Sequence, residues 1–88
     1  MVQAELTVEN PEGIHLGPAN KIANVADKFK SEIHLKTEYM DMNAKSIISI
    51  VSATFRKGDK FLCVCKGPDE KEALEAMKDI MSRNLEDE

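Results

Sequence analysis

The chain has 88 residues, a net charge of −4 and a hydrophobic fraction of 42%. This length predicts one domain, residues 1–88, that buries somewhat more than roughly 60% of the surface of the unfolded chain. The acidic balance argues against nucleic acid as a partner, because phosphate backbones select basic surfaces. No apolar run approaches the roughly 20 residues that span a bilayer, and no signal-peptide pattern is visible, so we expect a cytoplasmic protein without membrane insertion.

The N-terminal part of the chain predicts a strand followed by a helix. Apolar and polar residues alternate over residues 2–9, "VQAELTVE", which is typical of a half-buried strand. From Leu16 to about Lys28 the apolar spacing changes to that of a helix. The predicted core face of the strand carries Val2, Ala4, Leu6 and Val8. The predicted apolar stripe of the helix carries Ala19, Ile22, Ala26 and Phe29.

Two short strands are predicted in the middle of the chain, with a hairpin between them. Residues 32–36, "EIHLK", alternate in polarity, and residues 39–44, "YMDMNA", do so again. His34 should point to solvent or to the open face of the sheet, because it alternates with apolar neighbours. The predicted core face of the two strands carries Ile33, Leu35, Met40, Met42 and Ala44.

Residues 45–53, "KSIISIVSA", fit two kinds of element. Their β-branched side chains favour a strand. Ser46 favours a helix instead, because a serine directly before a helix is a good N-cap. We interpret this stretch as a short helix.

A fourth strand is predicted over residues 61–66, "FLCVCK", with Phe61, Cys63 and Cys65 on its core face. The i, i+2 spacing of the two cysteines disfavours a disulfide between them, because their side chains are parallel. The spacing also matches no zinc pattern. We therefore expect two small core residues.

The last predicted element is a helix within residues 67–85, "GPDEKEALEAMKDIMSRNL". Asp69 should cap it, and Glu72, three residues on, should complete a capping-box pair. The element order is then β-α-β-β-α-β-α. This order predicts an α+β fold, in which helices cover one face of a four-stranded, mainly antiparallel sheet.

Three motifs stand in register along the chain: "GIHxxPA" at residues 13–19, "NAKSI" at residues 43–47 and "GPDEKEAL" at residues 67–74. Together they resemble the HPr family, the histidine-containing phosphocarrier proteins of the bacterial phosphoenolpyruvate–sugar phosphotransferase system. The resemblance covers essentially the whole chain. It implies an open-faced β-sandwich with three helices on one face of the antiparallel sheet, and it implies that residues 45–53 contain a helix.

The resemblance also implies a function. A histidine at the position of His15 accepts a phosphoryl group from phosphoenolpyruvate-protein phosphotransferase, the first enzyme of the system, and passes it to sugar-specific acceptor domains. A neutral imidazole nitrogen is a competent nucleophile near pH 7, and a helix N-terminus favours the phosphoryl anion. No metal, nucleotide or organic cofactor is indicated.

Ser46 is the second site that the resemblance implies. In Gram-positive members a serine at this position is phosphorylated by an HPr-type serine kinase, and a catabolite-control repressor would be a further partner. The other interpretation is that Ser46 is only the cap of a short helix. A phosphate there would add roughly −1.5 to −2 charge beside the partner surface.

We expect that partner surface to lie beside His15. Three β-branched side chains on one short helix cannot all face the core, and an exposed apolar patch marks an interaction site. Gly17 departs from the family motif, which has an arginine that contacts the phosphoryl group. Lys21 could supply a cation, but without the same fork geometry. The residues predicted to contact partners are Leu16, Gly17, Ile47, Ile48 and Val51.

Two main hypotheses follow. The first is a phosphocarrier phosphorylated on His15, and the retained histidine favours it. The alternative is a regulatory HPr-like binding module switched by phosphorylation of Ser46, which the missing arginine at Gly17 favours. A third possibility is a phosphocarrier for a dedicated non-sugar branch with its own first enzyme.

Overall fold

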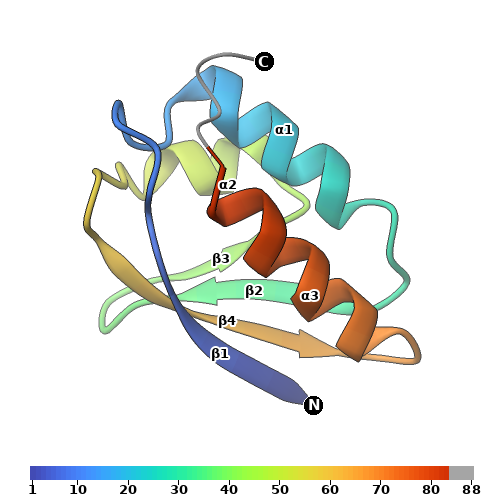
Figure 1. The fold of residues 1–88 in the computed structure, drawn as a ribbon. Helices are drawn as coiled ribbons and strands as arrows, with labels where there is room; N and C mark the ends of the chain where they lie inside the picture. The colour runs from blue at the N-terminus through green and yellow to red at the C-terminus, as the bar shows by residue number, and fades with distance from the viewer. Residues whose placement is uncertain (84–88) are drawn as a thin grey trace.

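The computed structural model describes residues 1–83, which form a four-stranded antiparallel sheet with three helices on one face (Figure 1). The strand order is β1-β4-β2-β3. The predicted α+β open-faced sandwich and its element order are confirmed. The predicted helical residues 84–85 lie outside the described part of the chain. The elements are β1 (Val2–Thr7), α1 (Leu16–Ala26), β2 (Glu32–Lys36), β3 (Asp41–Asn43), α2 (Ile47–Ser52), β4 (Lys60–Lys66) and α3 (Glu70–Met81).

The register of the sheet gathers one apolar row from all four strands. Cys63 of β4 lies opposite Ala4 of β1 on one side and Leu35 of β2 on the other. Leu35 in turn lies opposite Met42 of β3. Because side chains alternate between the two faces of a strand, this register places the apolar members of each strand under the helices.

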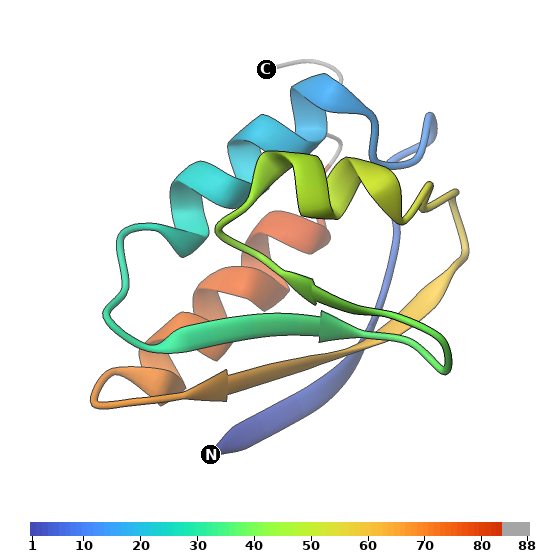
Figure 2. The same ribbon diagram turned by 180° about the vertical axis from the view of Figure 1, so that it is seen from behind.

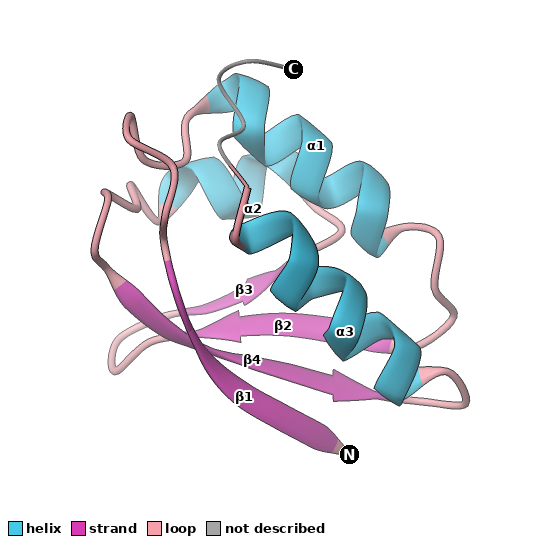
Figure 3. Ribbon diagram, viewed as in Figure 1, coloured by secondary structure: helices cyan, strands magenta, loops and turns pink. Residues whose placement is uncertain are grey.

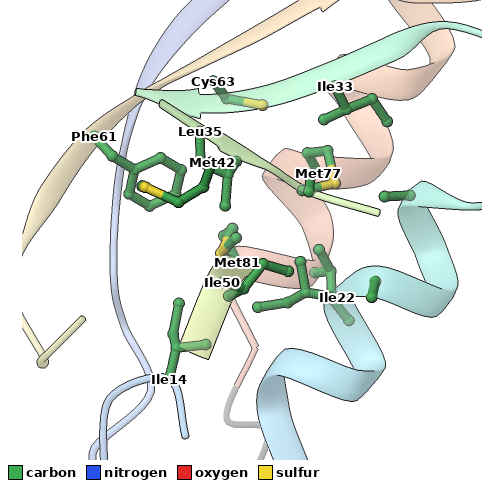
Figure 4. Packing of buried hydrophobic residues seen from close by; sticks show 14 of the residues in the cluster. Ile14, Ile22, Ile33, Leu35, Met42, Ile50, Phe61, Cys63, Met77 and Met81 are labelled. Atoms are coloured by element: carbon green, nitrogen blue, oxygen red, sulfur yellow. The ribbon is translucent and has the colours of Figure 1, made fainter. Parts of the chain in front are cut away.

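The three helices lie across this face as one layer (Figures 2 and 3). Ile22 of α1, Ile50 of α2 and Met77 of α3 are fully buried and gather between the helices and the sheet (Figure 4). Burial of one large apolar side chain stabilises a fold by about 1.5–3 kcal/mol. Each helix is therefore held to the sheet by at least one such anchor.

Met40 does not face the core, contrary to the prediction. Strand β3 begins only at Asp41, and the Met40 carbonyl accepts a hydrogen bond from the Thr37 N–H group at 2.8 Å. Met40 therefore belongs to the turn between β2 and β3, and its side chain is 39% exposed. The alternation in "YMDMNA" extends beyond the paired residues, so the pattern gave too long a strand.

Helix α1 ends at Ala26, two residues before the predicted end. The N–H groups of Lys28 and Phe29 donate to the carbonyls three residues earlier, those of Val25 and Ala26. This spacing marks a tighter final turn. Phe29 is half-buried and still packs against the core, from the loop rather than from the helix.

Asp69 occupies the N-cap position of α3, but its side chain does not cap the helix, so the predicted capping box with Glu72 is wrong. Its carboxylate instead accepts hydrogen bonds from the N–H groups of Lys30 at 3.0 Å and Ser31 at 2.9 Å, and from the Ser31 hydroxyl. The Ser31 hydroxyl is the first cause that lowers the pKa of Asp69 to about 2. These contacts tie the start of α3 to the loop before β2.

The two cysteines are free and buried, as predicted, and burial raises the pKa of the Cys63 thiol. His34 points to the open face of the sheet, one of the two predicted orientations, but it is not simply solvated there. Its Nδ1 atom lies 2.8 Å from Oδ1 of Asp41, and its Nε2 atom lies 3.6 Å from Oε1 of Glu32. His34 therefore links β2 to β3 on the sheet face opposite the helices.

Candidate functional site

The loop before α1 is fixed against the segment that follows α2. Gly13 has a φ of +74°, and a Cβ atom at this position would collide with the carbonyl oxygen of Phe55. The Ile14 N–H group donates to that same carbonyl at 3.0 Å. The buried Asn10 side chain donates to the Gly13 carbonyl at 2.6 Å. A glycine is required here, because only glycine adopts a positive φ this close to another backbone without strain.

His15 is the N-cap residue of α1, which begins at Leu16 as predicted. Its backbone is extended, its carbonyl accepts the N–H group of Ala19 at 2.9 Å, and its exposed side chain does not cap the helix. The first N–H groups of a helix have no carbonyl partner within it. Those of Leu16 and Gly17 therefore lie beside the imidazole, whereas Pro18 has none to offer.

Gly17 has open space around it. A Cβ atom there would meet only Cε1 of His15, at 3.8 Å, which is an ordinary van der Waals contact. Gly17 lies within α1 and has no positive φ, so the fold does not require glycine at this position. Leu16, its neighbour, exposes 66% of its surface.

Helix α2 presents its apolar residues unequally. Ile50 is fully buried, whereas Ile48 is 83% exposed. Ile47 and Val51 are half-buried and pack against the core. Ser46 is the N-cap, and its hydroxyl accepts a hydrogen bond from the N–H group of Ser49 at 3.2 Å. The helix therefore presents Ile48 to a partner, together with the exposed parts of Ile47 and Val51.

Two adjoining hollows join these residues into one surface, and Val51 lines both of them. The first is lined by Glu12, Ile14, His15, Val51, Thr54 and Phe55. The second is lined by Leu16, Ile47, Ile48, Val51 and Ser52. The structure thus brings together His15 and the predicted apolar residues, with Gly17 next to the imidazole. Ser46 lines neither hollow and stands at the start of the helix beside them.

Sequence reasoning did not assign four residues of the first hollow to the site: Glu12, Ile14, Thr54 and Phe55. Phe55 is buried, and its ring lies 5.1 Å from that of Phe61 on β4. A buried aromatic residue is a visible signal for a core position. Phe55 also contacts the loop before α1, which is about forty residues away in the sequence, and no local pattern indicates such a contact.

Within residues 1–83, no group of three or more histidine, cysteine, aspartate or glutamate side chains could hold a metal ion. None of the helices in this part of the chain has the length and apolar character needed to cross a membrane.

Comparison with known proteins identifies the family of the chain. The chain matches the family model described as "PTS HPr component phosphorylation site" over residues 2–83. This chain belongs to the HPr family. It is 38% identical to the phosphocarrier protein HPr of Mycoplasma pneumoniae over 85 residues, which cover 96% of this chain and 97% of that protein. The resemblance found in the three sequence motifs is therefore confirmed.

Solved structures of the family have the same fold. The HPr of Thermoanaerobacter tengcongensis superposes with a TM-score of 0.87 at 32% identity, covering 92% of this chain and 91% of that one. Crh, a catabolite repression HPr from Bacillus subtilis, superposes with a TM-score of 0.77 at 29% identity, covering 97% and 98% of the two chains. HPr phosphocarriers and a regulatory relative are thus both similar to this chain.

Proposed function

We propose that this HPr-family chain carries a phosphoryl group on His15. It would accept the group from phosphoenolpyruvate-protein phosphotransferase and pass it to sugar-specific acceptor domains, an exchange that we place in the cytoplasm. The observation that carries this proposal is the position of His15. Its side chain is exposed, does not cap α1, and stands beside an apolar surface on which a partner can dock.

The chemistry needs an unprotonated imidazole nitrogen, which imidazoles provide near neutral pH. That nitrogen attacks phosphorus, and a P–N bond forms as the bond from phosphorus to the donor breaks. The electron pair of the broken bond leaves with the donor. The N–H groups of Leu16 and Gly17 and the dipole of α1 favour the negative charge of the bound phosphoryl group.

The docking surface would consist of Leu16, Gly17, Ile47, Ile48 and Val51. Leu16 and Ile48 are largely exposed, and they belong to different helices that meet beside His15. Exposed apolar side chains gathered in this way mark a protein interaction site. Transfer then occurs within the docked complex, since His15 lies at the border of the surface.

Incubation with phosphoenolpyruvate and the first enzyme tests this proposal. We expect an acid-labile label on the native protein and none on His15→Ala, with both proteins melting at the same temperature. His34→Ala is the matched control, because it removes the other histidine of the chain and should still be labelled. Undiminished labelling of His15→Ala would show that the acceptor is a different residue.

Ser46 supports a second candidate function, a regulatory module switched by an HPr-type serine kinase and read by a catabolite-control repressor. The observation that favours it is that Ser46 begins the helix that presents Ile48. The similarity to Crh is consistent with this candidate. A kinase-dependent, acid-stable label on the native protein, lost in Ser46→Ala, is the expected result. A label that persists in Ser46→Ala would remove Ser46 from this account.

A further inference from the structure

Thr54 lies beside His15 in an unfavourable backbone conformation. Its φ is +51°, and among residues 1–83 it is the one non-glycine residue with a positive φ. This region is uncommon for any side chain and most unfavourable for a β-branched one. Strain of this kind persists where the surrounding structure imposes it, and it is concentrated at functional sites.

The fold explains why the backbone turns at this position. Ala53 is the C-cap of α2, so Thr54 is the residue just beyond it, where helices commonly end in a left-handed residue. Phe55 is buried immediately afterwards, and its carbonyl accepts the Ile14 N–H group. The residues before and after Thr54 thus fix its backbone conformation. Glycine, or failing that asparagine, satisfies this position at lower cost, so the fold does not explain a threonine.

The side chain of Thr54 has a place in the site. Thr54 and His15 line the same hollow, and they directly flank the hydrogen bond between Ile14 and Phe55. The Thr54 hydroxyl donates to the carbonyl of Ala53 at 2.7 Å and is exposed. A hydroxyl can rotate and give its single hydrogen to another acceptor. A phosphoryl oxygen is a better acceptor than a neutral carbonyl, because the bond to it is charge-assisted.

We propose that Thr54 is a phosphoryl-binding residue, whose hydroxyl turns from the Ala53 carbonyl to an oxygen of the phosphoryl group on His15. The inference rests on the proposed phosphorylation of His15. It gives the site a side-chain donor although Gly17 offers none. It also explains why a strained threonine stands where glycine would be more stable.

The test uses phosphoramidate, a small phosphoryl donor that phosphorylates histidine without a protein partner. In the reaction the imidazole nitrogen forms the new P–N bond, and ammonia leaves as the P–N bond of the donor breaks. We would measure the rate of acid-labile phosphorylation of His15, the ³¹P chemical shift of the product, and the melting temperature. The proteins are the native chain, Thr54→Ser, Thr54→Val and Thr54→Gly, with His15→Ala to establish the labelled residue.

Thr54→Val keeps the shape and the strain but removes the hydroxyl, so its phosphorylation should slow by about tenfold, the low end for a hydrogen bond to a charged group. Thr54→Ser keeps the hydroxyl and should stay within about twofold of the native rate and keep the ³¹P shift. Thr54→Gly should melt at a higher temperature than the native chain and yet be as slow as Thr54→Val. Thr37→Val, which removes a hydroxyl in the turn between β2 and β3, should leave the rate unchanged.

The outcomes separate this inference from the function on which it rests. If the native chain takes no label on His15, both fail together. If His15 is labelled but Thr54→Val and Thr54→Gly match the native rate and ³¹P shift, the role of Thr54 is wrong and the carrier function stands. A slow phosphorylation rate for Thr54→Val, together with a native-like rate for Thr54→Ser, supports the inference.

Discussion

The two ends of the helical layer are held in different ways. At one end, where β4 turns into α3, the Asp69 carboxylate accepts hydrogen bonds from the loop before β2, from Lys30 and Ser31. We call this group the bracket. At the other end, the loop of residues 10–15 meets residues 54–55 after α2. Figures 1 and 2 show these two pairs of loops at opposite ends of the molecule.

The polar groups of the bracket are paired with one another, which is what a structural contact requires. At the His15 end, the imidazole does not cap α1, Thr54 holds an unfavourable φ, and Leu16 and Ile48 are exposed. The charged contact of the bracket thus lies away from the site, whereas an unfavourable backbone conformation and exposed apolar side chains lie at it. Changes at the first end should therefore alter stability, and changes at the second should alter phosphoryl transfer.

Two isoleucines of α2 give the largest contrast. Ile50 is fully buried, so Ile50→Ala should lower the free energy of unfolding by about 2–5 kcal/mol. Ile48 is 83% exposed, so Ile48→Ala should change it by less than about 0.5 kcal/mol. Ile48→Ala should instead weaken binding to the first enzyme. Urea unfolding and a binding titration measure the two effects. The account would be contradicted if Ile50→Ala were as stable as the native chain and Ile48→Ala bound the first enzyme normally.

The bracket gives the next effect, a dependence of stability on pH. The pKa of Asp69 is lowered from 3.8 to about 2, first by the Ser31 hydroxyl. A lowered pKa means that the ionised carboxylate stabilises the fold. This contribution is fully present above about pH 4 and is lost as pH falls toward 2.

Asp69→Asn should accordingly be less stable than the native chain at pH 6, and the difference should shrink between pH 4 and 2. Denaturant unfolding along this pH series measures it. Asp79→Asn, on the exposed face of α3, is the control and should change stability little, since the Asp79 carboxylate forms a surface ion pair with Arg83. A constant difference for Asp69→Asn at every pH would mean that its charge contributes nothing.

Gly17→Arg tests the His15 end of the molecule. Gly17 lies within α1 and has open space, so an arginine should fit without loss of stability. Its guanidinium would add a charge-assisted contact to the phosphoryl group. Such a bond contributes about 1.5–3 kcal/mol, and exposure favours the low end, so transfer should accelerate about tenfold.

Transfer rates at two salt concentrations, with one first enzyme, measure this effect. The advantage of Gly17→Arg should shrink at high salt, because exposed charges are screened. Gly17→Gln is similar in length but neutral, and it should resemble the native chain. Equal or slower transfer by Gly17→Arg would mean that Gly17 is matched to a different partner surface, as in the dedicated non-sugar branch.

Ser46→Asp should have the smallest effect on stability. Its carboxylate can still accept the Ser49 N–H group and is favoured by the helix dipole, so stability should hold or rise by about 0.3–1 kcal/mol at most. Binding to the first enzyme should weaken, because a negative charge appears beside Ile47 and Ile48. Ser46→Asn, a neutral cap, should bind normally. Equal binding by Ser46→Asp and Ser46→Asn would exclude a charge switch.

The sequence predicted the parts of this molecule that depend on local spacing. Alternation located the strands that carry Ile33, Leu35 and Cys63, and a period near 3.6 located α1 and α3. Ser46 was predicted as an N-cap, and its hydrogen bond to the Ser49 N–H group confirms it.

The predictions failed where a distant residue competed with a local partner. Asp69 binds Ser31, 38 residues away, instead of capping its own helix. His34 contacts Asp41 of the next strand on the open face of the sheet, a partner that was not predicted. The unusual backbone of Thr54 arises because α2 must end just before Phe55 enters the core. No propensity of "SATF" indicates this, since the constraint is tertiary.

The chain contains two histidines, so one experiment can decide its central property. Imidazole ¹H–¹⁵N spectra and ³¹P spectra, recorded after incubation with phosphoenolpyruvate and the first enzyme, report which ring is phosphorylated. We predict a phosphoramidate ³¹P signal and a large change in the His15 ring signals, with those of His34 unchanged beside Asp41 and Glu32. Phosphorylation of His34, or no phosphohistidine at all, would contradict the proposal that His15 carries the phosphoryl group.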